Sequence, residues 1–278
     1  MPKRSSSVVG REFGNGMRAA IDATGMTQRE IAVELGWQEA KLSDMLAGKG
    51  GVTETEVREL LAYCRTPRAE RDRLLELFRE QGNAFVRFTD DGVPEQVQTL
   101  INQERETNEV EAWSMVVVPG LLQIRDYIAA VTAKARTVSA DNLAATIEAR
   151  VARTEILDYN RTFTFYVHEQ ALWLPVGGEE VWREQLAHLL RMSVRKYISI
   201  RVVPRSIGVH AGLSGDFRLM KFPKYPPVVY VESVKCCLFF DDKETVDTYE
   251  SILKDLAAVA LDEEQSRAVI NSILEGLQ

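Results

Sequence analysis

The sequence is short of the residues that most often build metal and catalytic centres. It has three cysteines, Cys64, Cys236 and Cys237, which are too few and too scattered for a disulfide framework or a zinc site. Histidine also occurs only three times. The zinc-protease spacing H-E-x-x-H, the nucleophile elbow G-x-S-x-G and the phosphate-binding P-loop are all missing. We therefore expect no bound metal, no cofactor and no enzymatic activity.

Long apolar runs are missing as well. No stretch approaches the roughly 18–20 apolar residues that cross a bilayer, and residues 1–10 lack the apolar segment of a secretory signal. Apolar residues make up 45% of the chain and charged residues 27%, as in globular proteins. Because 278 residues exceed one ordinary domain, we expect a cytoplasmic protein of two domains, preceded by a disordered arm over residues 1–9.

The chain also lacks the excess of positive charge that is common in DNA-binding proteins. It carries 34 Lys and Arg against 41 Asp and Glu, a net charge of −7. Residues 1–80 hold 13 basic and 13 acidic residues, so the negative excess lies entirely in the remainder. The first part is the more basic end, which mildly favours a nucleic-acid role there. Its neutrality predicts weak non-specific DNA affinity with a shallow salt dependence.

What the sequence does contain is a helix-turn-helix pattern in residues 27–49. Thr27 and Glu30 have the spacing of a capping box, in which each residue bonds the backbone amide of the other. Apolar residues follow at helical spacing, and Gly36 occupies the turn. A second helix over residues 38–47 ends at Gly48. The outer face of this second helix is expected to enter the major groove of DNA.

Residues 13–63 share further positions with a known family. They are Met17, Arg18, Gly25, Met26, Thr27, Gln28, Ile31, Ala32, Leu35, Gly36, Leu42, Ser43 and Gly48, followed by a helix over 53–61. In these positions the segment resembles the five-helix, repressor-type DNA-binding domain of the Cro and phage-repressor (XRE) family. The resemblance implies a transcriptional regulator whose partner is double-stranded operator DNA.

The resemblance also implies roles for individual side chains. Base edges would be read by Gln38, Glu39, Ala40, Lys41 and Asp44. Phosphates would be contacted by Arg18, Gln28, Arg29, Ser43 and Lys49. Many relatives carry Ser, Arg or Gln where this chain has the acidic Glu39 and Asp44, and a carboxylate near a polyanion needs a specific donor. A protein-interaction regulator with a degenerate motif that does not bind DNA is therefore the first alternative.

One such motif buries little surface on DNA. Specific affinity usually requires two half-sites that lie one helical turn apart, so we expect a homodimer. The DNA-binding domain is predicted over residues 10–82, and the turn and polar residues of 83–94 predict a linker.

Residues 95–278 alternate between helical and strand patterns. Helices are predicted over 96–109, 123–133, 140–158, 179–193, 243–259 and 262–274, and strands over 111–118, 163–173, 198–203, 217–222, 228–232 and 238–241. This order indicates an α+β domain with a mostly antiparallel sheet, which follows the all-α five-helix domain.

A second set of residues connects this part to another family. They are the run 118–123 (VPGLLQ), Tyr127, Arg150, Arg153, the run 168–172 (HEQAL), Gln185, Leu186, Leu189, Val203, Pro204, Gly212, Phe217 and the run 229–232 (VYVE). The region resembles a domain of unknown function, DUF5753, which follows a repressor-type helix-turn-helix in many actinobacterial regulators, notably of Streptomyces. The resemblance implies an antitoxin-like regulator. Its second domain would bind a ligand or a small partner protein encoded nearby, of the DUF397 type.

Four polar residues of this domain would form a pocket if the fold brought them together. His168 and Glu169 are adjacent, His210 lies in a glycine-rich segment, and Glu232 ends a predicted strand. Such a cluster could bind a ligand or a partner. A ligand-processing enzyme at this cluster is the second alternative function. If the residues lie apart, each satisfies only its own local hydrogen bonds.

Overall fold

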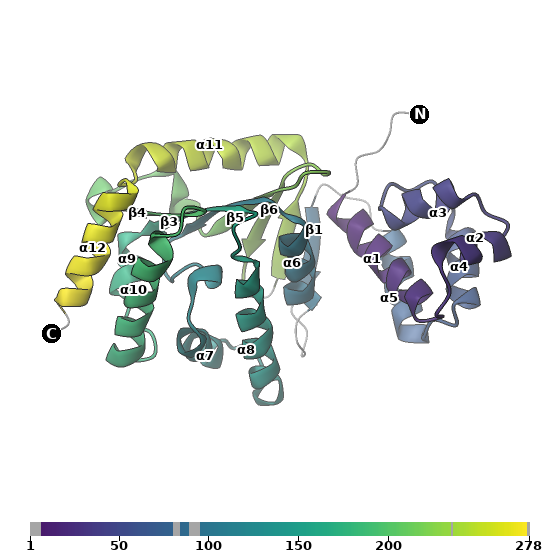
Figure 1. Cartoon of the computed structure of the whole chain (residues 1–278), viewed down its shortest axis with the longest axis horizontal. Coiled ribbons are helices and arrows are strands. Elements are labelled where there is room, and N and C mark those ends of the chain that lie inside the picture. Colours follow the sequence, from purple (N-terminus) through teal and green to yellow (C-terminus); the bar gives the residue numbers. More distant parts are fainter. Residues whose placement is uncertain (1–6, 80–83, 89–94, 235, 277–278) are drawn as a thin grey trace. The chain divides into compact units, whose positions relative to one another are not determined.

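The computed structural model describes residues 7–79, 84–88, 95–234 and 236–276. The chain divides into two compact units, Met1–Phe85 and Val86–Gln278 (Figure 1). Among the described residues, no helix is both long enough and apolar enough to cross a membrane.

The first unit is the predicted five-helix domain. Its helices are α1 (Val8–Asp22), α2 (Gln28–Glu34), α3 (Glu39–Leu46), α4 (Glu54–Tyr63) and α5 (Arg68–Arg79). The expected arm over residues 1–9 is wrong at its end, because α1 begins at Val8. Ser7 caps this helix, and its hydroxyl accepts a hydrogen bond from the Gly10 amide at 3.0 Å. Residues 1–6 of the expected arm lie outside the described residues.

Local sequence signals explain where these helices begin and turn. Thr27 and Glu30 form the predicted capping box: the Thr27 amide donates to Glu30 Oε2 at 2.8 Å, and the Glu30 amide donates to Thr27 Oγ1 at 3.3 Å. Thr53 and Glu56 repeat this arrangement at the start of α4. Gly36 adopts a φ of +65° between α2 and α3, a conformation that residues other than glycine disfavour.

Close backbone packing fixes the place of α3 in this domain. A Cβ atom on Gly14 of α1 would lie 2.3 Å from the carbonyl oxygen of Leu46, the last residue of α3. A Cβ atom on Gly10, one turn earlier, would lie 2.4 Å from the Gly48 oxygen. Leu42 and Met45 are buried on the inner face of α3. Glycine on α1 therefore lets the end of α3 approach its backbone directly.

The second unit contains the remaining elements. Its helices are α6 (Glu95–Glu106), α7 (Arg125–Lys134), α8 (Leu143–Ala152), α9 (Glu169–Trp173), α10 (Glu179–Ser193), α11 (Lys243–Val259) and α12 (Glu263–Glu275). Its 3-10 helices are η1 (Gly120–Leu122), η2 (Ala140–Asn142), η3 (Arg153–Ile156), η4 (Arg205–Ile207) and η5 (Ala211–Ser214). Its strands are β2 (Glu109–Ser114), β3 (Thr162–His168), β4 (Ile198–Val203), β5 (Phe217–Lys221), β6 (Val228–Glu232) and β7 (Cys236–Phe240).

Several predicted elements differ from the structure, among them the strand predicted over 111–118, which is β2 and ends at Ser114. The strand predicted over 163–173 ends at His168, whose Nδ1 accepts a hydrogen bond from the Gln170 amide at 3.2 Å and so starts helix α9. The helix predicted over 140–158 is divided into η2, α8 and η3. The linker predicted over 83–94 is wrong in part, since Ala84–Phe88 forms strand β1 beside β7. Its remaining positions, 83 and 89–94, lie outside the described residues.

The strands form a mixed sheet in the order β1-β7-β6-β5-β2-β3-β4. Strand β3 runs parallel to both β2 and β4, whereas the β2–β5, β5–β6 and β6–β7 pairs are antiparallel. The α+β class is confirmed. The change from parallel to antiparallel pairing takes place at β2, which has a neighbour of each kind.

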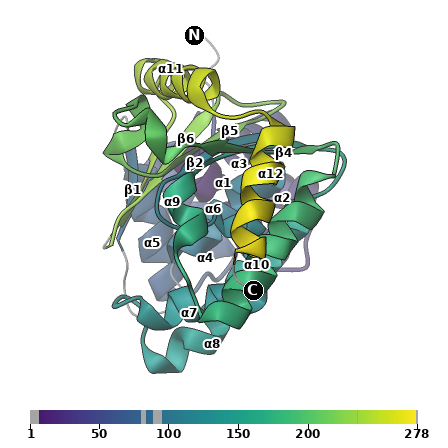
Figure 2. The same cartoon turned by 90° about the vertical axis from the view of Figure 1, so that its left-hand side faces the viewer.

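Helices cover both faces of this sheet (Figures 1 and 2). Helix α11 lies over one face, where Val246, Leu253 and Leu256 pack against a cluster that includes Trp113 and Phe217. Helices α6, α7, α8 and α10 lie on the other face. Residues that follow one another along a strand point to opposite faces, so the register decides which helices each side chain meets.

Candidate functional site

The outer face of α3 is open, as a DNA-reading helix requires. Gln38, Glu39, Ala40, Ser43 and Asp44 are all exposed, whereas the opposite face of the helix is buried. Gln38 is the N-cap residue, but its side chain makes no capping hydrogen bond, so its amide remains able to contact a base edge. Four of the five predicted base-reading side chains therefore lie on an accessible surface.

The fifth, Lys41, is held by neighbours within the domain. Its ammonium group donates a short hydrogen bond to Glu56 of α4 and lies 4.9 Å from the centre of the Trp37 ring. The side chain is only 29% exposed. The ammonium group has three donors, so the bond to Glu56 competes with, but does not exclude, donation to a guanine in the major groove.

Ion pairs also neutralise the two acidic residues on this face. Glu39 pairs with Arg29 at 3.2 Å, and Asp44 pairs with Lys49 at 3.5 Å. Both pairs are exposed, so separating either ion pair costs little free energy. Each pair nevertheless keeps its cation close to the reading helix. Two of the predicted phosphate contacts are therefore the donors that the acidic residues need.

The other predicted phosphate contacts lie in different settings. Gln28 is the exposed first residue of α2, where helix amides favour anions. Arg18 of α1 donates to the Leu46 carbonyl at 3.3 Å and to Asn15 at 3.1 Å, so it bonds the C-terminal end of α3. It contributes to the position of the reading helix as well as to local positive charge.

In the second unit, two of the four predicted pocket residues stack on each other. The His168 and His210 rings lie 5.6 Å apart, and the edge of Trp113 contacts both. His210 Nδ1 accepts a hydrogen bond from the Gly212 amide at 3.1 Å. Burial lowers the pKa of both histidines, which keeps the pair neutral near pH 7. Glu169, next in the chain, accepts a hydrogen bond from the Arg205 amide at 3.0 Å.

The fourth residue, Glu232, lies on the other face of the sheet. The strand register places Trp113 beside Phe217 and Phe217 beside Val231, so these three side chains share the α11 face. Glu232 follows Val231 and points the opposite way. The four residues therefore do not meet in one pocket, which was the condition for a shared site at this cluster. Among the described residues, no three His, Cys, Asp or Glu side chains are grouped to hold a metal ion.

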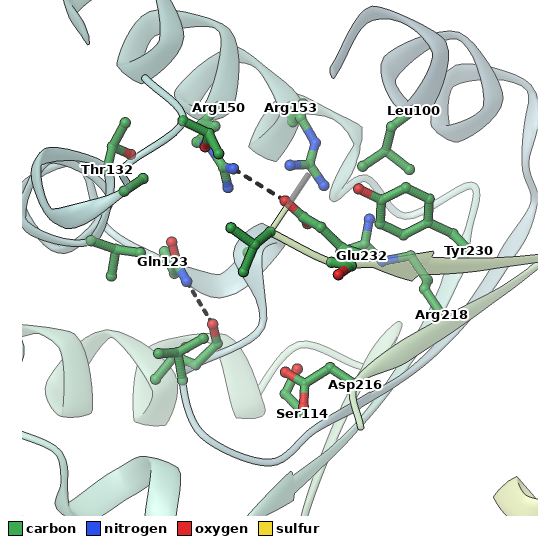
Figure 3. Close-up of a pocket in the computed structure, with 18 of the residues that line it drawn as sticks. Leu100, Ser114, Gln123, Thr132, Arg150, Arg153, Asp216, Arg218, Tyr230 and Glu232 are labelled. Carbon is green, nitrogen blue, oxygen red and sulfur yellow. Dashed lines mark hydrogen bonds and ion pairs between the residues drawn. The ribbon is translucent and has the colours of Figure 1, made fainter. Parts of the chain in front are cut away.

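Glu232 instead lines a cavity of about 520 Å³, open to solvent at its edge, between the sheet and helices α7 and α8 (Figure 3). Drug-sized ligands usually occupy pockets of roughly 300–1,000 Å³. The cationic residues of the lining are Lys134, Arg136, Arg150, Arg153 and Arg218, and its carboxylates are Asp216 and Glu232. Apolar side chains complete it, among them Leu100, Val117, Val118, Val131 and Val138.

A buried charge cluster forms part of the cavity wall. Glu104 of α6 is fully buried and accepts two hydrogen bonds from Arg153, at 2.9 and 2.8 Å, and a shorter one from Arg218 of β5. Burial by itself raises the pKa of Glu104. The two positive charges and the hydrogen bonds outweigh that effect and hold the pKa below its usual value.

Of the site residues predicted from the sequence, only Glu232 lines this cavity, and no sequence pattern predicted the cavity itself. Arg150 and Arg153 were noted only for a family resemblance. Their spacing from Thr146, four and seven residues along a helix, is the signal that places all three on one face of α8 and η3. Arg218 and Glu104 come from distant segments, and no local pattern connects them.

The two units together describe a helix-turn-helix domain followed by an α+β domain with its own cavity. Residues 12–74 match the sequence model of a helix-turn-helix domain. Residues 97–272, more than half of the chain, match the family described as a domain of unknown function (DUF5753). The chain belongs to that family.

No similar sequence is found among curated proteins. Among solved structures, the chain is similar to TrmBL2, an archaeal chromatin protein described as showing a novel mode of DNA binding. The TM-score is 0.31 and the sequence identity 11%; the similarity covers 75% of this chain and 66% of TrmBL2. The chain thus spans just under two thirds of that protein's length.

Proposed function

We propose that this protein is a sequence-specific, DNA-binding transcriptional regulator of the XRE type. The observation that carries the proposal is the open outer face of α3, on which Gln38, Ala40 and Ser43 present polar and methyl groups. A face of this composition can pair with adenine, contact a thymine methyl and bond a phosphate. The helix-turn-helix match over residues 12–74 supports the same function.

Fluorescence anisotropy with the full chain and DNA from upstream of its own gene tests this proposal. A duplex of the same composition in scrambled order serves as the comparison, over about 50–200 mM salt. We expect clear preference for the upstream DNA. Gln38→Ala should cost about 1–3 kcal/mol on that DNA and reduce the preference, because it removes a contact to a base edge.

Arg29 and Arg68 offer a matched pair for the phosphate contact. Both side chains are more than 80% exposed, and each has one carboxylate partner, Glu39 at 3.2 Å and Asp72 at 3.6 Å respectively. Arg29→Gln should weaken binding to both duplexes and reduce the slope of log K against log salt by about 1. Arg68→Gln on α5 should leave both quantities unchanged.

The internal ion pairs of α3 favour one alternative. Because Glu39, Lys41 and Asp44 all have partners within the domain, the helix can be stable and soluble without DNA. The chain would then be an interaction protein with a degenerate motif. Equal affinity for the upstream and scrambled duplexes at low salt would establish this alternative and refute the proposal.

We further propose that the second unit is a regulatory domain without catalytic activity, which binds a ligand or a small partner protein in an antitoxin-like manner. The separation of Glu232 from His168 and His210 supports this role, because it removes that carboxylate from the catalytic cluster considered for the second unit. A ligand or partner that binds the second unit can change operator affinity only if it binds two arrangements of the dimer with different affinities. A hydrolytic activity of the purified chain that His168→Gln and His210→Gln both abolish would contradict this assignment.

A further inference from the structure

We propose that the cavity beside β6 binds a small amphipathic anion, a carboxylate or phosphate monoester attached to an apolar body. The anionic group is placed between Arg150 of α8 and Arg218 of β5, and the apolar body lies against the valine-rich wall. The inference rests on the regulatory role proposed for the second unit, but its test measures ligand binding separately from DNA binding.

The cavity wall carries an excess of positive charge. Arg153 and Arg218 share a single carboxylate, Glu104, so this group of three retains one positive charge; Glu104 is fully buried, and the two arginine side chains are only 6% and 11% exposed. Arg150 and Glu232 form a longer pair at 3.6 Å and do not remove the excess. Counting Asp216, Lys134 and Arg136, five cations face three carboxylates. Buried charge is costly without a partner, and an anionic ligand would supply one.

The cavity lining also contains buried polar atoms without hydrogen-bond partners among the described residues. Thr146 Oγ1, Arg150 Nε and Arg218 Nε are buried and have no hydrogen-bond partner among the described residues, and all three residues line this cavity. Thr146 and Arg150 lie one helical turn apart on α8, while Arg218 comes from the facing sheet. Figure 3 shows the Arg150 and Arg218 side chains on either side of Glu232. Three unpartnered donors in the lining of one cavity fit an oxygen-rich anionic group.

The apolar wall of the cavity indicates what the rest of the ligand is like. Val117, Val118, Val131 and Val138 line the same cavity, so an inorganic ion would leave most of this apolar wall uncovered. A ligand with an apolar body gains about 25 cal/mol for each Å² that it buries there. Lys134 and Arg136 are exposed, and neither has an ion-pair partner within the described part of the chain. Their charge at the edge of the cavity would attract anions.

The position of the cavity in the fold is consistent with a ligand site. It lies beyond the carboxyl ends of β2 and β6, where Ser114 and Glu232 line it. The strand order reverses beside β2, because β3 and β4 follow it on one side and β5, β6 and β7 lie on its other side. In open α/β sheets, ligands bind outside the carboxyl ends of the strands where the strand order reverses.

Isothermal titration calorimetry of the full chain without DNA tests the inference. The probes are octanoate and octyl phosphate, with 1-octanol and octylamine as neutral and cationic molecules of the same chain length. We expect both anions to bind and neither control to bind up to about 1 mM, a concentration at which 1-octanol is still dissolved. The stronger of the two anions identifies the source chemistry as carboxylate or phosphate.

Three variants assign the binding to this cavity. Arg150→Gln should weaken anion binding about tenfold, the value of one charge-assisted hydrogen bond. Glu232→Gln should strengthen it severalfold, since it removes a competing carboxylate and frees Arg150. Arg191→Gln, at an exposed site on α10 outside the cavity, should change nothing. A purely structural role for Arg150 and Glu232 does not predict opposite effects.

The inference is overturned if neither octyl anion binds, if octanol or octylamine binds equally well, or if Arg150→Gln and Glu232→Gln leave the anion affinity unchanged. Intrinsic fluorescence confirms that each variant is folded. Failure of these titrations leaves the DNA result intact, and failure of DNA preference leaves the titrations intact. A loss of operator affinity on adding the anion would connect the two functions.

Discussion

Replacing Glu104 by Gln examines the buried charges that form the cavity wall. The substitution keeps the shape of the side chain but removes the charge that Arg153 and Arg218 share. Both guanidinium groups then remain buried without a counter-charge. Removing one partner of a buried ion pair typically costs about 3–5 kcal/mol. For a domain the size of Val86–Gln278, each kcal/mol lowers the Tm by about 2–4 °C, so we expect a decrease of roughly 6–20 °C.

Tryptophan fluorescence can follow this unit selectively. Trp113, Trp173 and Trp182 all lie in the second unit, and a Trp37→Phe background removes the signal of the first. The control is Glu148→Gln, which removes an exposed ion pair with Arg125 and should leave the midpoint almost unchanged. Equal midpoints for the two variants would refute the argument that the Glu104 cluster is a buried charge site.

The pH dependence has a definite sign. The pKa of Glu104 is held below its usual 4.5 in the folded protein, so the carboxylate stabilises the fold above about pH 4.5. That contribution is lost as the pH falls through the lowered pKa, where the folded protein also takes up the proton. The difference in unfolding free energy between the parent and Glu104→Gln should therefore shrink below about pH 4.5. A constant difference would indicate that the charge of Glu104 does not stabilise the fold.

Three further predictions concern other parts of the chain. Gly14→Ala should destabilise the first unit by about 1–3 kcal/mol in urea unfolding, because the new Cβ would meet the Leu46 oxygen; a gain in stability, as at an open helical site, would contradict this. Burial and nearby arginines lower the pKa of His188, so protonation of this side chain at low pH favours the unfolded state. The urea concentration at the unfolding midpoint should therefore decrease as the pH is lowered from 7 to 5, and it should decrease less in His188→Gln. Sedimentation equilibrium should give twice the chain mass; a monomer at micromolar concentration would contradict the proposed homodimer.

The sequence was most informative where neighbouring residues determine the structure. The capping box at Thr27 and the turn at Gly36 involve groups within three or four positions of each other, and the structure confirms both. Helices α10 and α11 begin and end at the predicted residues for the same reason, since their apolar periodicity is strong and local.

Local patterns failed where the fold brings distant segments together. The alternation that predicted a strand over 163–173 continues into α9, but the His168 side chain caps a helix there and the tertiary structure buries Ala171 and Leu172. Residues 84–88 looked like a linker because a short strand has little signal of its own. Its place beside β7 depends on a partner some 150 positions later in the chain.

The sequence by itself determined the five-helix head, its open α3 face and the α+β class of the second unit, since helix periodicity, caps and turns are properties of short segments. Only the tertiary structure decided the strand order and separated Glu232 from His168 and His210. The tertiary structure also forms the cationic cavity, because it brings Glu104 together with Arg153 and Arg218, which lie 49 and 114 positions away in the chain. Long-range pairing depends on which surfaces are buried against each other, and no single segment contains that information.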